Sequence, residues 1–176
     1  EIAVAAWRAS FFDGDGAPRI ATARAGNVIG GGDWSTHRLL PDIVRAFGSG
    51  QTLGLRMPQA VRPWQHVLEA LAGYLLLAER LCDNDGTRHA RGWNFGPAAD
   101  DHLTVGDVAQ RCADLWGDGA RIKIAEANFQ KETDTLRLDA GDAREFLGWR
   151  PRWDADQALR QTLAWHRRWL ENPDDV

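Results

Sequence analysis

The sequence predicts an α/β domain in which most strand pairs are parallel. Segments with apolar residues at helical spacing alternate along the chain with short apolar runs typical of strands. One of these runs ends in three consecutive glycines, Gly30 to Gly32, as a strand does where it passes into a turn. With 176 residues, 44% of them hydrophobic, the chain is long enough to bury one hydrophobic core.

The first third of the chain predicts two helices and two strands. Residues 1–12 carry small and apolar side chains at helical spacing, but no Ser, Thr, Asp or Asn precedes them to cap the first amide groups. We therefore expect the chain to begin inside a helix whose preceding segment is missing. Residues 19–28 predict a strand that ends at the glycines, residues 40–47 a helix, and residues 53–56 a short strand.

The remainder predicts a long helix over 64–82, with an apolar stripe facing the core, and a brief strand over 93–95. The stripe consists of Val67, Leu68, Leu71, Leu75 and Ala78. Thr104 and Asp107 form a capping-box pattern at the start of the next helix. The last expected elements are a strand over 121–125, a helix over 140–147 and a helix over 154–170 capped by Asp154.

Charge and composition exclude several classes of function. The net charge is −4 and there is no basic run, so nothing indicates a partner nucleic acid. Neither a membrane-spanning apolar run nor a signal peptide is evident, which predicts a soluble cytoplasmic protein with no membrane partner. Cys82 and Cys112 lack metal-ligand spacing, so we expect packed free thiols and no metal site.

The stretch RAGNVIGGGDW, residues 24–34, is the first candidate ligand site. It matches neither a P-loop nor a complete dinucleotide-binding glycine pattern. One interpretation is a flexible connection after a strand. The other is a ligand-binding turn, since ligands of α/β folds bind at the carboxyl ends of the strands and Asn27 lies there, close to Asp33 and Trp34.

Five segments in order give the chain a resemblance to the CDP-glucose 4,6-dehydratases of the extended short-chain dehydrogenase/reductase superfamily. The resemblance covers nearly the whole chain. The segments are RAGNVIGGGDW (24–34), RLLPD (38–42), RPWQHVLEALAGYLLLAE (62–79), WNFGP (93–97) and FLGWRPRW (146–153).

The resemblance implies a reaction in which bound NAD takes a hydride from C4 of the glucosyl unit of CDP-glucose. Water then leaves across C5 and C6, and the hydride returns at C6 to give the 4-keto-6-deoxy sugar nucleotide. Such an enzyme needs a glycine-rich NAD-binding segment and a Tyr-x-x-x-Lys pair. This chain has neither, since its one tyrosine, Tyr74, has Ala78 four residues on. We therefore expect no catalytic residue here, and an isolated chain without activity.

By the same resemblance, the chain is the C-terminal part of a Rossmann-like fold: the last strands of the parallel sheet and a small substrate-binding α/β subdomain. It would form one incomplete domain over 1–176. Residues 1–34 would end the dinucleotide-binding sheet, and residues 35–176 would be mainly substrate-binding, with a returning strand near 92–96. The expected partners are a nucleotide sugar, CDP-glucose, and either further copies of the chain or an N-terminal half that binds most of the NAD.

The resemblance also assigns site residues. Asn27 would bind the substrate pyrophosphate region, Arg62 the diphosphate, and Arg38 the phosphates or the nucleotide. The backbone of Val28 and Ile29 would lie near the nicotinamide of NAD, while Asp33 and Trp34 would shape the pocket. The alternatives are a turn role for Asp33 and surface ion pairs for Arg38 and Arg62.

Other residues are expected to be structural. Tyr74, Trp64 and His66 are expected to pack, and Asn94 to fix a loop. In the segment KETDTLRLD (131–139), Lys131 stands where the family has histidine, which leaves a nucleotide contact there open. Two other functions remain open: a non-catalytic module for nucleotide-sugar binding or interaction, and another nucleotide-sugar epimerase or dehydratase of the superfamily.

Overall fold

The computed structural model describes residues 1–14, 16–98, 101–125 and 133–175. Its strands associate in pairs, and three of the four described pairs are parallel. The parallel pairs are β1 (Thr22–Ala25) with β6 (Gly92–Phe95), β2 (Asn27–Ile29) with β5 (Trp64–His66), and β3 (Thr52–Leu55) with β8 (Arg121–Ile124); β4 (Val61–Arg62) runs antiparallel to β7 (Leu103–Thr104). The expected α/β class, the mainly parallel pairing and the strand near 93–95 are thus confirmed.

A helix lies at each place where the sequence predicts one. The helices are α1 (Ile2–Phe11), α2 (Leu39–Gly48), α3 (Val67–Cys82), α4 (Val105–Trp116), α5 (Gly141–Phe146) and α6 (Ala155–Glu171), with 3-10 turns η1 (Gly86–His89) and η2 (Pro173–Asp175). The Thr104 hydroxyl accepts from the Asp107 amide, and the Asp107 carboxylate accepts from the Thr104 amide, so the expected capping box is present. Asp154 caps α6 by accepting from the amide of Gln157.

The predicted strand over 19–28 is two strands that pair with different partners. Its break falls at Gly26, where an added Cβ would lie 2.3 Å from the carbonyl oxygen of Pro63. The amide of Asn27 donates to that same carbonyl at 2.8 Å, which brings the chain beside β5. Because a contact with a residue distant in sequence ends β1, the pattern of apolar residues over 19–28 does not reveal that two strands are present.

The predicted helix over 64–82 begins only at Val67. Residues 64–66 form β5 against β2, and all three are buried. His66 then caps α3, because its Nδ1 accepts a hydrogen bond from the amide of Leu68. The expectation of a packed, hydrogen-bonded imidazole at His66 is confirmed.

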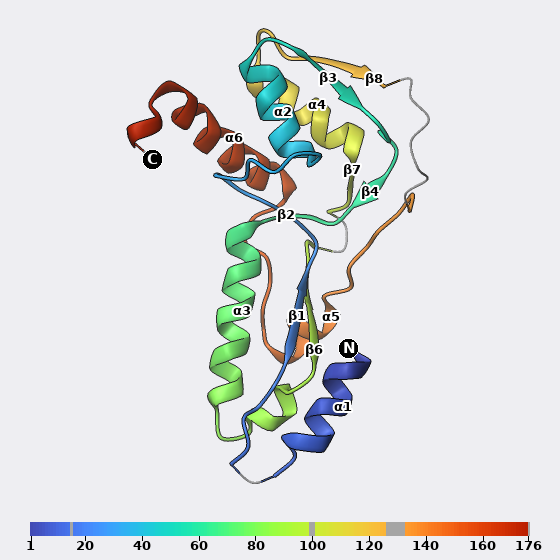
Figure 1. Cartoon of the computed structure of the whole chain (residues 1–176), viewed down its shortest axis with the longest axis vertical. Helices are drawn as coiled ribbons and strands as arrows, with labels where there is room; N and C mark the ends of the chain where they lie inside the picture. Colours follow the sequence, from blue (N-terminus) through green and yellow to red (C-terminus); the bar gives the residue numbers. More distant parts are fainter. Residues whose placement is uncertain (15, 99–100, 126–132, 176) are drawn as a thin grey trace.

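The expectation of one core is wrong, because the described residues form two hydrophobic clusters. The upper cluster in Figure 1 joins α2, α4 and α6 with the nearby strands, and the lower one joins α3, α5 and β6. The upper cluster contains Ile29, Leu40, Ile43, Val44, Ala46, Phe47, Leu53, Leu55, Trp64, Leu103, Val108, Ala109, Cys112, Ala155, Ala158, Leu159 and Leu163; the lower contains Leu77, Trp93, Phe95, Ala140, Ala143, Leu147 and Trp149.

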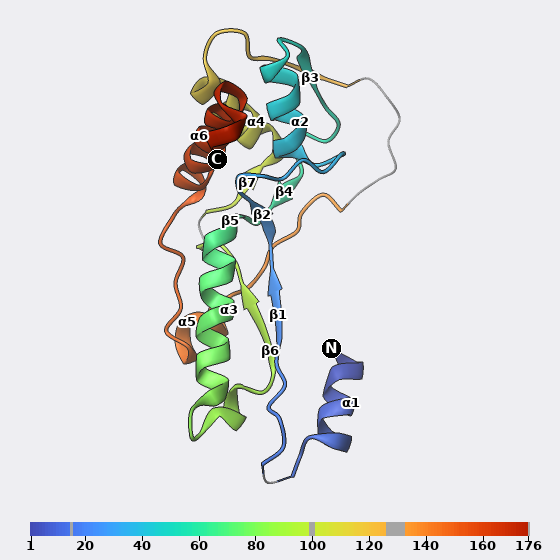
Figure 2. The same cartoon turned by 60° about the vertical axis from the view of Figure 1, so that its left-hand side comes forward.

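The apolar stripe of α3 is exposed, contrary to the expectation that it faces the core. Leu75 is 72% exposed, whereas the side that packs inward carries Glu69, Ala70, Gly73 and Leu77. Helix α1 buries no residue at all and lies apart from α3, on the other side of β1 (Figure 2). The lower half of the molecule therefore presents two uncovered apolar helix faces.

Candidate functional site

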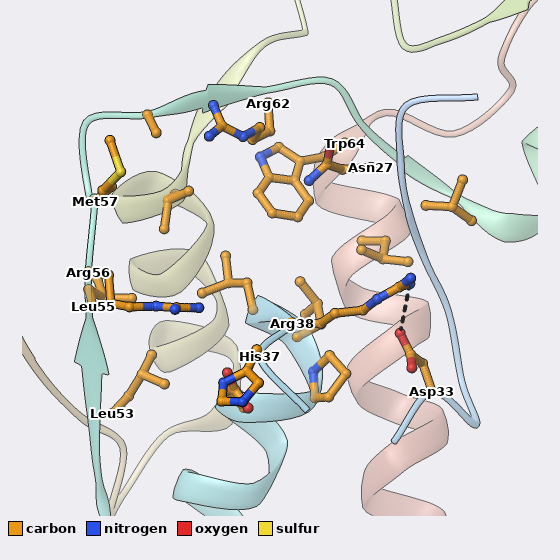
Figure 3. A pocket seen from close by; sticks show the side chains of 18 of the residues that line it. Asn27, Asp33, His37, Arg38, Leu53, Leu55, Arg56, Met57, Arg62 and Trp64 are labelled. Atoms are coloured by element: carbon orange, nitrogen blue, oxygen red, sulfur yellow. Dashed lines mark ion pairs between the residues drawn. The ribbon is translucent and has the colours of Figure 1, made fainter. Parts of the chain in front are cut away.

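A pocket of about 570 Å³ lies beside β2 and β3, next to the segment that connects β2 to α2. Six of the seven predicted site residues line it: Asn27, Val28, Ile29, Asp33, Arg38 and Arg62. Figure 3 shows the side chains of Asn27, Asp33, Arg38 and Arg62 around it. The seventh, Trp34, is not among its lining residues. The structure thus brings together side chains that are up to 35 positions apart, Asn27 and Arg62.

One end of the pocket is formed by Asn27, Arg62 and Trp64, which Figure 3 shows close together. Asn27 stands opposite Trp64 in the β2–β5 register. The Trp64 ring is buried and its Nε1 donates to the carbonyl of Leu103 at 3.1 Å, which confirms the expected packing role. Arg62 donates to the adjacent carbonyl of Val61 at 2.9 Å. This end combines a guanidinium and an amide, groups that donate hydrogen bonds to phosphate oxygens.

The opposite end carries an ion pair between Asp33 and Arg38, with Nη1 and Oδ2 3.6 Å apart (Figure 3). Asp33 also accepts from the amide of Ser35 at 3.0 Å, so the turn role considered for it is present. Partial burial acts to raise the pKa of Asp33, but hydrogen bonds from Ser35 and the charge of Arg38 outweigh it and keep that pKa below its ordinary value. The Arg38 side chain is 65% exposed, and an exposed ion pair of this kind is weak enough to exchange for a stronger anion.

Close packing leaves no space for a side chain at Gly30 and Gly31, the first two glycines after β2. A Cβ on Gly31 would lie 2.3 Å from the Trp165 ring, and one on Gly30 would lie 2.7 Å from Val67. Only Gly32 of the three has a positive φ, 78°. Of these glycines Gly30 alone lines the pocket. Close packing against Trp165 of α6 is thus a reason for glycine at position 31 that the sequence alone did not give.

Sequence reasoning missed several lining residues, among them His37, Arg56 and Met57. A signal for Arg56 was available, because it is the last residue of the expected strand over 53–56 and ligand sites lie at strand ends. His37 has a φ of 63°, a conformation rarely adopted by residues other than glycine. Such backbone strain occurs preferentially at ligand sites, but the sequence contains no trace of it.

Trp34 points away from the pocket lining and toward α6. Its ring centroid lies 4.9 Å from that of His166 and 4.5 Å from that of Trp169. Asp33 therefore lines the pocket, whereas its neighbour Trp34 packs on α6. A ligand contact by Trp34 stays a prediction without support from its position.

The residues expected to be structural make the expected contacts. The Tyr74 ring packs edge-on against Phe95, with centroids 5.6 Å apart. Asn94 donates to the carbonyl of Asp139 at 2.8 Å and accepts from Arg24 at 2.7 Å, so it fixes a loop. Lys131, with its departure from the family pattern, lies outside the described residues.

The described residues contain no cluster of three or more His, Cys, Asp or Glu side chains with a metal-binding arrangement. Cys112 is buried, and burial raises the pKa of its thiol to about 12, so it is unreactive at neutral pH. Cys82 is also a free thiol, but it is exposed, and the expectation that it packs is wrong. Within the described ranges no helix combines the length and hydropathy needed to cross a bilayer.

Comparison with solved structures defines the class of fold. The chain superposes with a TM-score of 0.76 on a UDP-glucuronic acid 4-epimerase from Bacillus cereus in complex with UDP-glucuronic acid and NAD, at 13% identity, covering 94% of this chain and 49% of that one. A UDP-glucose 4-epimerase from Stenotrophomonas maltophila with bound NAD superposes with a TM-score of 0.77 at 20% identity, covering 95% of this chain and 52% of that one. A dTDP-glucose 4,6-dehydratase from Bacillus anthracis in complex with NAD superposes with a TM-score of 0.73 at 19% identity, covering 95% of this chain and 48% of that one. The chain therefore has the fold of about half of an extended short-chain dehydrogenase/reductase acting on nucleotide sugars.

Sequence comparison is more specific. No family model matches the chain. It is 42% identical over 178 aligned positions to the CDP-glucose 4,6-dehydratase of Salmonella typhimurium, covering 99% of this chain and 49% of that protein. The resemblance found in the sequence motifs is thus confirmed: the chain is similar over nearly its whole length to that dehydratase and spans about half of the relative's length.

Proposed function

We propose that this chain is the substrate-binding portion of an NAD-dependent CDP-glucose 4,6-dehydratase, which converts CDP-glucose to CDP-4-keto-6-deoxyglucose. The identity of 42% along nearly the whole chain carries the proposal. The meeting of Asn27, Arg38 and Arg62 around one pocket supports it, because a sugar diphosphate needs several donors around its oxygens. We assign residues 1–34 to the end of the cofactor-binding sheet and residues 35–176 mainly to substrate binding.

In this proposal Arg62 and Asn27 hold the diphosphate at one end of the pocket. Arg38 exchanges its partner Asp33 for a phosphate or the nucleotide, and Trp34 stays a candidate only for shaping the pocket from beneath. Val28 and Ile29 lie on β2 next to Asn27 and line the pocket. We therefore propose that their backbone forms one edge of the nicotinamide site, and that the rest of this site comes from outside these residues. When bound, NAD accepts and returns the hydride of the sugar.

The isolated chain is proposed to be inactive. A phenol serves as a base at neutral pH only when a neighbouring cation lowers its pKa from about 10. Tyr74 is the one tyrosine of the sequence, and its ring packs against Phe95 at the side of the lower cluster. Its position four residues on is Ala78, so α3 supplies no lysine on that face.

The exposed apolar faces of α1 and α3 favour a second candidate function. Ile2, Trp7 and Phe11 on α1, and Leu68 and Leu71 on α3, are exposed. Apolar faces of this kind mark protein contacts. We propose that they contact either further copies of this chain or an N-terminal half that supplies NAD binding; a non-catalytic interaction module would use the same faces without a nucleotide.

Ligand-observed NMR with CDP-glucose tests the proposal. The chain should bind the nucleotide sugar, and Arg62→Ala should weaken binding by about 1.5 to 3 kcal/mol, roughly tenfold to more than a hundredfold in Kd, because a charge-assisted hydrogen bond is lost. Arg88→Ala, which removes an exposed arginine paired with Asp85 away from the pocket, should leave Kd unchanged.

Incubation of the same chain with NAD and CDP-glucose tests the rest. We expect no 4-keto product. Turnover by the chain alone would contradict the proposal that it lacks the catalytic groups. In the binding experiment, an Arg62→Ala variant that binds CDP-glucose as tightly as the original chain would show that Arg62 is not part of the site. No binding at millimolar nucleotide would favour the interaction module.

A further inference from the structure

The glycine turn after β2, of which Gly30 lines the pocket, packs on the C-terminal helix α6. The Trp165 ring lies so close that a Cβ on Gly31 would stand 2.3 Å from its Cγ and Cδ2. Rotation of the ring about χ2 leaves Cγ in place, so the side chain could give way only by a change of χ1 that moves the whole ring. A Cβ on Gly32 would meet the far edge of the same ring at 3.6 Å. Trp165 therefore fixes the height of the turn above α6.

A second contact from α6 holds the residue after the turn. His166 is completely buried, with its ring edge-on to Trp34 at 4.9 Å and to Trp165 at 5.1 Å between centroids. Burial lowers the pKa of His166, although the Gly30 backbone and the Asp33 carboxylate act in the opposite direction. A neutral imidazole can remain buried between two indole rings without the cost of a desolvated charge.

Helix α2 holds the same segment from the other side. Arg45 donates to the carbonyl of Trp34 at 3.0 Å and to that of Ser35 at 3.2 Å, and it also pairs with Asp42. The segment between Gly31 and Ser35 is thus held between α2 and α6. Asp33, in the middle of this segment, reaches the pocket and pairs with Arg38.

We propose that Trp165 and His166 are positioning residues for the nucleotide-sugar pocket: they set the glycine turn, and through it the placement of Asp33 and Arg38. Neither residue lines the pocket, so α6 acts on the ligand only through the turn. The inference rests on the proposed function for its ligand, but the contacts between α6 and the turn are independent of it.

A size exchange between Gly31 and Trp165 tests the proposal. The dissociation constant for CDP is measured by calorimetry for the chain and for Gly31→Ala, Trp165→Ala, Trp165→Phe and the double variant Gly31→Ala/Trp165→Ala. Hydrogen exchange at the Ser35 amide, which donates to Asp33, is measured in parallel. Trp7→Ala is the matched control, because Trp7 is 65% exposed on α1. Thermal unfolding verifies that each variant is folded.

We expect Gly31→Ala and Trp165→Ala each to weaken CDP binding about tenfold, the effect of losing one well-placed charged hydrogen bond, and to accelerate exchange at Ser35. Trp165→Phe should retain most of the affinity because a flat ring still supports the turn. The double variant should recover affinity and protection relative to Gly31→Ala, since the added methyl group then has space. Trp7→Ala should change neither quantity.

The proposal is overturned if the double variant is no better than Gly31→Ala, because Gly31 would then be needed for approach of the ligand itself. It is also overturned if Trp165→Ala is folded and leaves both Kd and exchange at Ser35 unchanged. If the unaltered chain does not bind CDP, the proposed function fails, and exchange at Ser35 across the same variants alone decides whether α6 positions the turn.

Discussion

At the scale of single residues, the neighbours Asp33 and Trp34 show what a pattern can predict. The sequence places both at a strand end, which is enough to locate the site but not to decide which side chain faces it. In the folded chain one reaches the pocket and the other packs on α6. That Asn27 and Arg62 lie at the same pocket was predictable from motif position, whereas no sequence pattern indicated the positive φ of His37.

Three buried histidines predict how stability depends on pH. Burial lowers the pKa of His66, against an opposing effect of Glu69, and burial also lowers the pKa values of His89 and His166. Their folded pKa values lie below the unfolded value of about 6.5, so the unfolded chain binds more protons as the pH falls through the window below it. The free energy of unfolding, measured with urea, should therefore be highest above pH 7 and decrease from there to pH 5.

The histidine variants identify the source of that slope. His166→Phe should flatten part of the pH dependence, while His37→Gln, which changes an exposed histidine, should leave it as it is. A free energy of unfolding that is constant or rises on acidification from pH 7 to 5 would contradict buried neutral imidazoles.

At the scale of elements, helices that carry both a capping residue and a regular buried face could be predicted from the sequence. In α4 the capping box and the buried face of Val108, Ala109 and Cys112 are local signals, and the structure has both. The end of β1 at Ala25 and the start of α3 at Val67 were not predictable. Both depend on the approach of Gly26 to Pro63, which brings β2 beside β5 and occurs only in the folded chain. The apolar stripe of α3 has helical spacing as predicted, but periodicity alone does not say what covers it.

The α4 cap gives a prediction at this scale. Thr104→Ala removes the hydroxyl that accepts from the Asp107 amide and should cost about 1 kcal/mol of stability, within a range of roughly 0.5–2 kcal/mol. Chemical denaturation measures it, with Thr36→Ala at an exposed turn position as control. Equal losses in the two variants would mean that the capping box does not stabilise α4.

At the scale of the whole molecule, the elements that carry the two clusters are arranged along an elongated body (Figure 1). The pocket is lined in part by residues of the upper cluster, among them Leu40, Leu53 and Trp64. The lower half exposes Leu71 and Leu75 of α3 together with the apolar residues of α1. The resemblance led us to expect association with further copies of the chain or with an N-terminal half. It did not predict that α3 would form part of an uncovered apolar face, because a stripe this regular is normally buried.

Association should therefore depend on concentration. Light scattering of the chain at increasing concentration should show a mean mass above that of one chain, because uncovered apolar faces bury surface when they meet. The double variant Leu71→Glu/Leu75→Glu should remain nearer to one chain, while Leu136→Glu, an exposed leucine outside these helices, should behave like the original. A single-chain mass at every concentration would contradict the proposed contact face.

The pocket between β2, β3 and α2 is the centre of the account, and a crystal structure of the chain with CDP-glucose tests it most directly. We predict density for the nucleotide sugar in this pocket, with diphosphate oxygens about 3 Å from the Arg62 guanidinium and the Asn27 amide. Nucleotide bound elsewhere on the chain, with Arg62 making no phosphate contact, would contradict the assignment of this pocket to the substrate.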